Sequence, residues 1–338
     1  KLNTGETLNA DMALICAGVA PDTHLAKSAG LALNARGAII VDEYLRTSNK
    51  DIYAVGDAIE VKHFVSGMPR HIPLAGPANK QGRLVADNIC GLQNAYKGTQ
   101  GSAILKFFDI AAASTGLNEA SAKEAGINYD KVHIYSLSHA SYYPGAADLY
   151  LKVLFQTDNG RILGAQIVGQ EGADKRCDVL ATAIRANMTI YDLCELELCY
   201  APPFSSAKDP VNMIGFAAEN ILTGKLKQFH WHEIDRIRQD KNAIILDTRT
   251  DYEYRFGAIS GAKHIPLDSL RARIKEIDKS KTVYVYCQSG LRSYLASRIL
   301  IQEGYDCYNL SGGYRLYSTT EKDSLYDPSP LLPCGAKG

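Results

Sequence analysis

The stretch "VYVYCQSGLRS" (283–293) constrains the fold most, because it joins an apolar strand to a helix through one short loop. Four β-prone residues run into Cys287, and the helical pattern "RSYLASRILIQEG" starts at Arg292. A strand followed at once by a helix is typical of parallel α/β domains. The same arrangement delivers Cys287 to the carboxyl edge of the sheet, where ligands of α/β folds usually bind.

The loop after Cys287 has the composition of an anion-binding turn. Its residues are Gln288, Ser289, Gly290, Leu291 and Arg292. Their backbone N–H groups can curl towards one point, and the following helix adds its positive end, so the loop favours a thiolate over a thiol. Gly290 removes a Cβ that would obstruct the curl. Arg292 can close the ring with a fixed charge, and Ser293 can cap the helix or donate to a bound group.

The spacing between Cys287 and Arg292 separates two chemistries. A cysteine phosphatase needs a wider loop for a phosphate, whereas the four residues here give a tighter ring that suits one extra sulfur atom. The alternative is a buried cysteine that merely ends a core strand. Cys307 lies in a strand context and is read as a core residue, and Cys334, in the tail without supporting neighbours, receives no role.

Composition limits the class of protein. At 338 residues the chain is long enough for two or three domains, and 46% of its residues are hydrophobic. Lys+Arg and Asp+Glu are equal at 37 each, so no basic surplus indicates nucleic acid or an anionic membrane. No apolar run reaches the roughly 18 residues of a membrane span. Eight cysteines without a CxxC pair suit reduced thiols, so we expect a cytoplasmic protein.

The sequence divides into segments of different character. Residues 1–97 alternate short apolar runs with Gly and Asn turns, which indicates α/β layers. Residues 101–223 read as antiparallel strands, with "DNG" (158–160) as a hairpin turn, and two helices near 174–187 and 209–223. A connector at 224–232 leads to the parallel α/β domain at 233–320, and 321–338 reads as a tail.

The first residues of the chain indicate a strand whose pairing strands are absent from this sequence. "ADMALICAGVAPD" (10–22) reads as the end of a buried strand, and nothing upstream supplies the strands that it would pair with. We therefore expect the chain to be the C-terminal part of a longer protein.

Residues from about 228 to 320 resemble the rhodanese family. Besides the Cys287 loop, "ILDTRTDYEYRFGAISGAKHIPL" (245–267) looks like the first rhodanese signature and "NLSGGYRLY" (309–317) like the closing one. The resemblance implies that Cys287 carries a persulfide stabilised by the 288–292 backbone. It also implies that Asp247 and Arg249 shape the pocket; the alternative for these two is a structural ion pair.

The first segment resembles the pyridine nucleotide–disulfide oxidoreductases. "TSNKDIYAVGDAIE" (47–60) looks like their second flavin motif, in which Gly56 allows close backbone approach to the ribityl chain and Asp57 accepts its hydroxyl hydrogen bonds. "HIPLAGPANKQGR" (71–83) predicts a helix start after Pro73, Leu74 and Ala75. That helix end can face the flavin pyrimidine edge, where negative charge accumulates on reduction.

The middle segment resembles the dimerisation domain of the same family. "SHASYYPGA" (138–146) and "CYAPPFSSAKDPVN" (199–212) look like coenzyme A-disulfide reductases and coenzyme A-dependent persulfide reductases. The resemblance implies that Tyr142 and Tyr200 approach the reacting sulfur of the partner subunit's site, with Tyr143 a close rival of Tyr142. It also places Phe204 near the flavin edge of the other subunit. Plain aromatic packing is the alternative for these residues.

Together these resemblances imply a multidomain α/β and α+β protein. It contains an incomplete FAD- and NAD(P)-binding part, an α+β dimerisation domain and a rhodanese-like domain, and it forms a homodimer. The whole protein would be an FAD-dependent, NAD(P)H-using reductase of coenzyme A disulfide or persulfide, coupled to a sulfurtransferase, acting on a small-molecule sulfur substrate. The chain has no G-x-G-x-x-G and no redox cysteine motif near the flavin segment, so alone it should bind FAD poorly. No motif indicates a metal.

Two other functions remain open at this point. An NADH oxidase or peroxidase with a rhodanese domain would share the flavin and dimer motifs, and the tyrosine pair is the local feature that distinguishes it. A non-redox dimerising scaffold that presents a sulfur-binding module is the second alternative.

Overall fold

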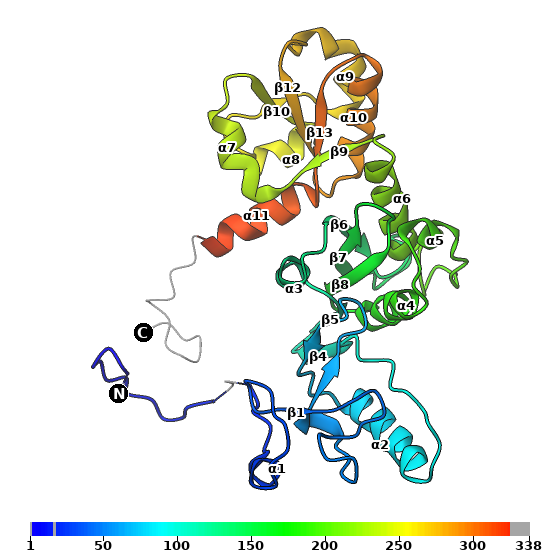
Figure 1. Cartoon of the computed structure of the whole chain (residues 1–338). Coiled ribbons are helices and arrows are strands. Elements are labelled where there is room, and N and C mark those ends of the chain that lie inside the picture. The colour runs from blue at the N-terminus through cyan, green and yellow to red at the C-terminus, as the bar shows by residue number, and fades with distance from the viewer. Residues whose placement is uncertain (1, 16–17, 325–338) are drawn as a thin grey trace.

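The computed structural model describes residues 2–15 and 18–324. Three units follow one another along the chain, and Figure 1 shows the parallel α/β unit at the top, the antiparallel sheet in the middle and the N-terminal unit at the bottom. No helix among the described residues has the length and apolar character needed to cross a membrane. The multidomain α/β and α+β architecture expected from the sequence is confirmed.

The N-terminal unit is small and has a three-stranded sheet. Strand β1 pairs parallel with β2, and β2 pairs antiparallel with β3. Its elements are α1 (His24–Ser28), β1 (Ile39–Ile40), the 3₁₀ turn η1 (Gly56–Ala58), β2 (Ile59–Lys62), β3 (Pro69–Arg70) and α2 (Ala75–Ile89). Helix α2 packs against η1, so the Gly56 turn and the start of α2 lie close together.

The strand predicted within residues 10–22 is wrong for the part of this range that the structure describes. Residues 10–15 and 18–22 form no strand, and Met12, Leu14 and Ile15 are more than 80% exposed. An isolated strand leaves its backbone groups unpaired, and no described segment pairs with this one. The run "DIYAVGDA" (51–58) forms an isolated bridge between Arg46 and Tyr53 and then the η1 turn.

The middle unit is a five-stranded antiparallel sheet covered by helices. Its strand order is β4-β5-β8-β7-β6. Its elements are β4 (Ala103–Phe107), β5 (Ile110–Gly116), α3 (Glu119–Glu124), β6 (Tyr129–Leu137), β7 (Asp148–Gln156), β8 (Ile162–Gly169), α4 (Ala173–Arg185), α5 (Ile190–Glu195) and α6 (Pro210–Leu222). The predicted "DNG" hairpin joins β7 to β8, where Gly160 adopts a φ of +73°. Fully buried Leu151, Val153 and Ile214 belong to its core.

The C-terminal unit is a five-stranded parallel sheet of order β11-β10-β12-β13-β9. Its elements are β9 (Lys227–Phe229), η2 (Trp231–Glu233), α7 (Ile234–Gln239), β10 (Ala243–Asp247), α8 (Asp251–Arg255), β11 (Lys263–His264), α9 (Leu267–Arg273), η3 (Ile274–Glu276), β12 (Thr282–Tyr286), α10 (Leu291–Gln302), β13 (Cys307–Leu310) and α11 (Gly313–Ser324). Helices α9 and α10 contribute to one core cluster, and α7 and α11 to another.

Two boundaries differ from those expected from the sequence. Strand β9 lies inside the range 224–232 assigned to a connector, because it pairs with β13 at the edge of the parallel sheet. Helix α11 continues to Ser324, into the range 321–338 assigned to a tail. The rest of that range, including Cys334, lies outside the described residues.

The middle and C-terminal units contact each other through polar side chains. The Gln228 side chain donates to Asp130 Oδ1 (3.0 Å) and to the Lys131 carbonyl (2.8 Å). The Arg315 guanidinium forms two hydrogen bonds of 2.9 and 2.7 Å with the Asp148 carboxylate. These paired contacts dock the parallel sheet onto β6 and β7 in a defined orientation.

Two histidines at this contact predict a pH-dependent stability. The rings of His133 and His230 lie 5.8 Å apart, and burial, with nearby positive charges, lowers the pKa of each from 6.5 to about 3. The stabilisation is therefore fully present above pH 6.5 and is lost as the pH falls from 6.5 towards 3. Calorimetry of the chain at about pH 7.5 and pH 5 should show a lower melting temperature at the acid pH.

The variant His133→Gln should show a smaller decrease, since glutamine does not titrate, whereas His24→Gln, which removes an exposed imidazole, should behave like the wild type. An equal decrease in wild type and His133→Gln would contradict this explanation.

Candidate functional site

Cys287 follows β12 directly, and its side chain is fully buried. Its Sγ accepts hydrogen bonds from the Gly290 N–H at 3.1 Å and from the Ser293 hydroxyl at 3.3 Å. Gly290 adopts a φ of +109°, which other residues reach only with strain, and it lies immediately before α10. The loop thus turns one amide and one hydroxyl towards the sulfur, an arrangement that suits a negatively charged sulfur atom.

The start of α11 fixes this loop from the opposite side. The N–H groups of Tyr314 and Arg315 donate to the carbonyls of Cys287 (2.8 Å) and Gln288 (3.0 Å). A Cβ on Gly313 would lie 2.8 Å from both carbonyl oxygens. The second glycine of "NLSGGYRLY" therefore permits the close approach that satisfies the loop carbonyls and the first amides of the helix together.

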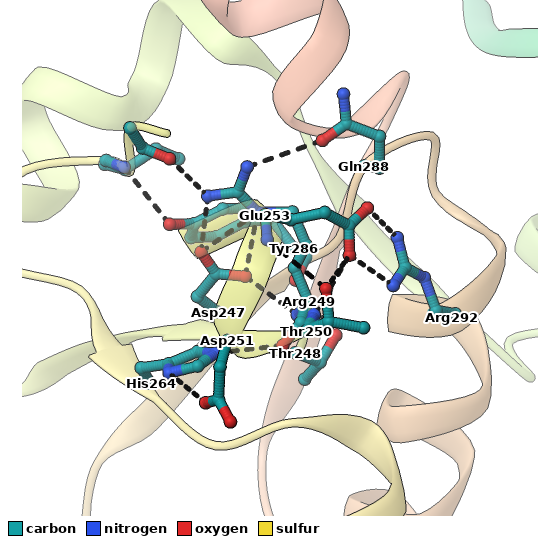
Figure 2. A network of polar contacts seen from close by, with 12 residues as sticks. Asp247, Thr248, Arg249, Thr250, Asp251, Glu253, His264, Tyr286, Gln288 and Arg292 are labelled. Carbon is teal, nitrogen blue, oxygen red and sulfur yellow. Dashed lines mark hydrogen bonds and ion pairs between the residues drawn. The ribbon is translucent and has the colours of Figure 1, made fainter. Parts of the chain in front are cut away.

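Asp247 and Arg249 form a buried ion pair beneath the loop (Figure 2). The guanidinium makes bonds of 2.7 to 3.1 Å to both carboxylate oxygens, and its carbon lies 4.0 Å from the centre of the Tyr314 ring. One more nitrogen points to the Gln288 side-chain oxygen at 3.4 Å. The pair therefore lies in the domain interior and also reaches the loop after Cys287 through Gln288.

Arg292 does not close a ring around the sulfur in the way that the sequence suggested. Its guanidinium forms a two-bond pair with the Glu253 carboxylate, at 2.7 and 2.5 Å (Figure 2). These hydrogen bonds lower the pKa of Glu253 to about 2, and the N–H and hydroxyl of Thr250 contribute. An ionised carboxylate is a stronger partner for a guanidinium than neutral amides are. Sequence reasoning missed Glu253, although the T-x-x-E pattern from Thr250 predicts a helix-capping glutamate.

The middle unit brings the two predicted tyrosines together. The hydroxyls of Tyr142 and Tyr200 lie 3.1 Å apart, and this hydrogen bond raises the pKa of Tyr142. Tyr143 instead packs edge-on against His139, with ring centres 5.7 Å apart. Phe204, in the same region, is 69% exposed. A positioned phenol can donate a proton to a leaving thiolate.

The residues predicted to hold FAD fit one half of such a site. Gly56 adopts a φ of +77° and its N–H is bound by Gln81, while the Asp57 side chain is exposed and makes no hydrogen bond with the described residues. Helix α2 starts at Ala75 after Leu74, and no side chain caps its first amides. Pro73 precedes this start. A free carboxylate and uncapped helix amides are the groups that ribityl hydroxyls and a reduced flavin ring would need.

A cavity of about 580 Å³ lies between the loop and the middle unit. Residues 289–291 line one wall, and parts of β6 and α6 line the other. Asn309 lies in the lining, and its buried Oδ1 has no hydrogen-bond partner among the described residues. Lys208 contributes a positive charge to the rim. The loop after Cys287 and the middle unit thus line one cavity. No group of histidine, cysteine and acidic side chains among the described residues is arranged to hold a metal.

Family models match all three units. Residues 1–82 match the pyridine nucleotide-disulphide oxidoreductase model, residues 102–210 match its dimerisation domain, and residues 230–320 match the rhodanese-like domain. The crystal structure of reduced Bacillus anthracis CoADR-RHD superposes with a TM-score of 0.92 and 49% identity, over 95% of this chain and 58% of that one. The coenzyme A disulfide reductase of Staphylococcus epidermidis is 37% identical over 217 residues, which are 64% of this chain and 49% of that protein.

The chain is similar to coenzyme A disulfide reductases over 64% of its length, and its residues 230–320 match the rhodanese-like domain. A second structure, the NAD-dependent persulfide reductase from A. fulgidus, superposes with a TM-score of 0.80 and 42% identity, over 88% of this chain and 54% of that one. The chain spans about half the length of the relatives it matches.

The Glu253–Arg292 ion pair leads to a prediction about the reactivity of Cys287, because Glu253 neutralises the positive charge of Arg292. In Glu253→Gln the amide still caps α8 but no longer neutralises Arg292, so the thiolate form of Cys287 gains a positive neighbour. The pair is partly exposed, so we expect only a two- to fivefold rise, roughly, in the rate at which iodoacetamide alkylates Cys287 at neutral pH. Mass spectrometry of the Cys287 peptide measures this rate.

The matched control is Glu276→Gln, which breaks an exposed ion pair with Arg273 elsewhere in the same domain. Equal alkylation rates in wild type and both variants would show that Arg292 has no influence on the sulfur.

Proposed function

We propose that the full-length protein is an FAD-dependent, NAD(P)H-using reductase of coenzyme A disulfide or persulfide, coupled to a sulfurtransferase that forms a persulfide on Cys287. The observation that carries the proposal is the Cys287 sulfur, which accepts the Gly290 amide inside a loop that lines the cavity shared with the middle unit. The names of the related disulfide and persulfide reductases support the reductase half.

In the sulfur-transfer step, the Cys287 thiolate attacks the outer sulfur of a donor persulfide. The S–S bond of the donor breaks, the donor leaves as a thiolate that keeps the bonding electron pair, and a new S–S bond forms on Cys287. No net oxidation or reduction occurs. The Gly290 amide and the Ser293 hydroxyl, which already contact Sγ, stabilise negative charge on the attacking sulfur.

The middle unit would supply the acid for the reductive step. Tyr142 and Tyr200 are joined by a hydrogen bond and exposed, so in a homodimer they can reach a site on the partner subunit. One phenol donates its proton to the departing thiolate, and the second holds the first in orientation. FAD, when bound, would supply electron transfer from the nicotinamide, and Asp57 and the uncapped start of α2 would be the groups that hold it.

The shared cavity explains why the two activities are joined in one chain. A sulfur carrier held between residues 289–291 and α6 stays near both units, so tethering raises its effective concentration for the next step. The cationic Lys208 side chain suits the anionic character of a phosphorylated thiol carrier.

Replacement of the nucleophile tests the sulfurtransferase half. Cys287→Ser should remove persulfide formation from a sulfane-sulfur donor, seen as the loss of one added sulfur atom in the mass of the chain, and should slow sulfide release from coenzyme A persulfide by the full-length protein.

The control is Cys307→Ser in the neighbouring strand β13. Burial raises the pKa of the Cys307 thiol to about 12, so it stays protonated and its replacement should leave transfer unchanged. Undiminished sulfur transfer by Cys287→Ser would exclude the proposed role.

A further inference from the structure

We propose that Arg176 is a positioning residue that sets the contact between Tyr142 and Tyr200. It touches neither tyrosine and acts through the two loops that carry them. The catalytic consequence rests on the function proposed above, whereas the positioning itself does not.

Arg176 lies in the first turn of α4, and its side chain is buried. One nitrogen, Nη2, donates to the Ser138 carbonyl (2.9 Å), to the Ser205 hydroxyl (3.2 Å) and to Asp209 Oδ2 (2.9 Å). Gly172 makes room for it, because a Cβ there would lie 2.3 Å from Nη1. A single buried cation thus joins the loop after β6 to the loop before α6.

The Asp209 carboxylate completes this connection. It accepts the Ser205 hydroxyl at 2.7 Å and the N–H of Val211 at 3.0 Å, which caps α6. Its side chain is only 2% exposed, and Arg176 is its cationic partner in the ion pair. The position of the second loop is therefore fixed both to α6 and to the guanidinium.

These loops determine where the phenols lie. Tyr142 is 74% exposed and Tyr200 is 47% exposed, so packing against neighbours holds neither ring strongly. The backbones of the two loops are joined by the Ala140 N–H, which donates to the Ser205 carbonyl at 3.0 Å. Arg176 binds Ser138, four residues before Tyr142, and Ser205, five residues after Tyr200. It therefore holds both loops next to that backbone hydrogen bond. The 3.1 Å contact between the two hydroxyls depends on the relative position of these two loops.

Arginine suits this position better than lysine does. A planar guanidinium offers donors in fixed directions: Nη2 reaches a carbonyl, a hydroxyl and Asp209 Oδ2, while Nε donates to Asp209 Oδ1 at 3.4 Å. An ammonium group keeps the charge opposite Asp209 but has no rigid fork. Arg176→Lys therefore retains the charge balance and loses the geometry, which makes it the informative variant.

The experiment reports on the tyrosine contact directly. A 3-fluorotyrosine is placed at position 142 of the chain and its ionisation is followed by ¹⁹F NMR as the pH rises. The hydrogen bond between Tyr142 and Tyr200 raises the pKa of Tyr142, so Tyr200→Phe should lower the titration midpoint. Arg176→Lys should lower the midpoint in the same direction, and the double variant should show little further change, because both single changes remove one contact.

The matched control is Leu180→Val, which removes a methylene from a fully buried residue on the same helix. It should lower the melting temperature and leave the midpoint unchanged. A wild-type midpoint in Arg176→Lys, or an equal shift in Leu180→Val, would overturn the proposal, since the residue would then be structural only.

The full-length protein gives a second readout. Arg176→Lys and Tyr200→Phe should each lower kcat for coenzyme A disulfide reduction, with little change in KM, and their effects should not add. Additive effects would contradict positioning. If the wild type reduces no such disulfide, the proposed function fails while the NMR result still decides the role of Arg176.

Discussion

The hydrogen bond from the Gly290 amide to the Cys287 sulfur is the interaction on which the rest of the account depends. It exists because two parts of the chain act on one short loop. Gly290 takes a left-handed conformation that turns its N–H inwards, and the first amides of α11 bind the carbonyls of Cys287 and Gln288 on the other side. The Gly290 amide and the Ser293 hydroxyl thus donate to Cys287 Sγ at the carboxyl edge of a parallel sheet, as the proposed persulfide would require.

The second constraint is the placement of that loop against the middle unit. Strand β9 follows α6 closely and becomes the edge strand of the parallel sheet, while Gln228 and Arg315 bind the surface of β6 and β7. The loop therefore opens onto a cavity whose far wall is β6 and α6. The loop after Cys287, proposed above to transfer sulfur, and the tyrosine-bearing unit therefore line the same cavity.

Local features of the site could be predicted from the sequence, and features that depend on distant segments could not. The strand, glycine turn and helix around Cys287 are contiguous, so their order predicts the loop. That Tyr142 and Tyr200 belong to one site was anticipated only through resemblance, because the two residues lie 58 positions apart in the sequence. The pairing of Arg292 with Glu253 could not be predicted, because Glu253 lies 39 residues earlier, on α8, and so Arg292 was assigned to the sulfur.

Pairing between distant strands also explains why some secondary-structure elements differ from those expected from the sequence. Strand β9 lies in a stretch with the composition of a connector, and only its pairing with β13 makes it a strand. The apolar run at 10–22 has strand-like composition, yet no described segment pairs with it.

The most direct test of the central claim is a high-resolution crystal structure of the chain after treatment with a sulfane-sulfur donor. The account predicts one additional sulfur atom bonded to Cys287 Sγ, with backbone amides of residues 288–292 within about 3.5 Å of it. An unmodified Cys287, with the added sulfur on another cysteine, would contradict the account.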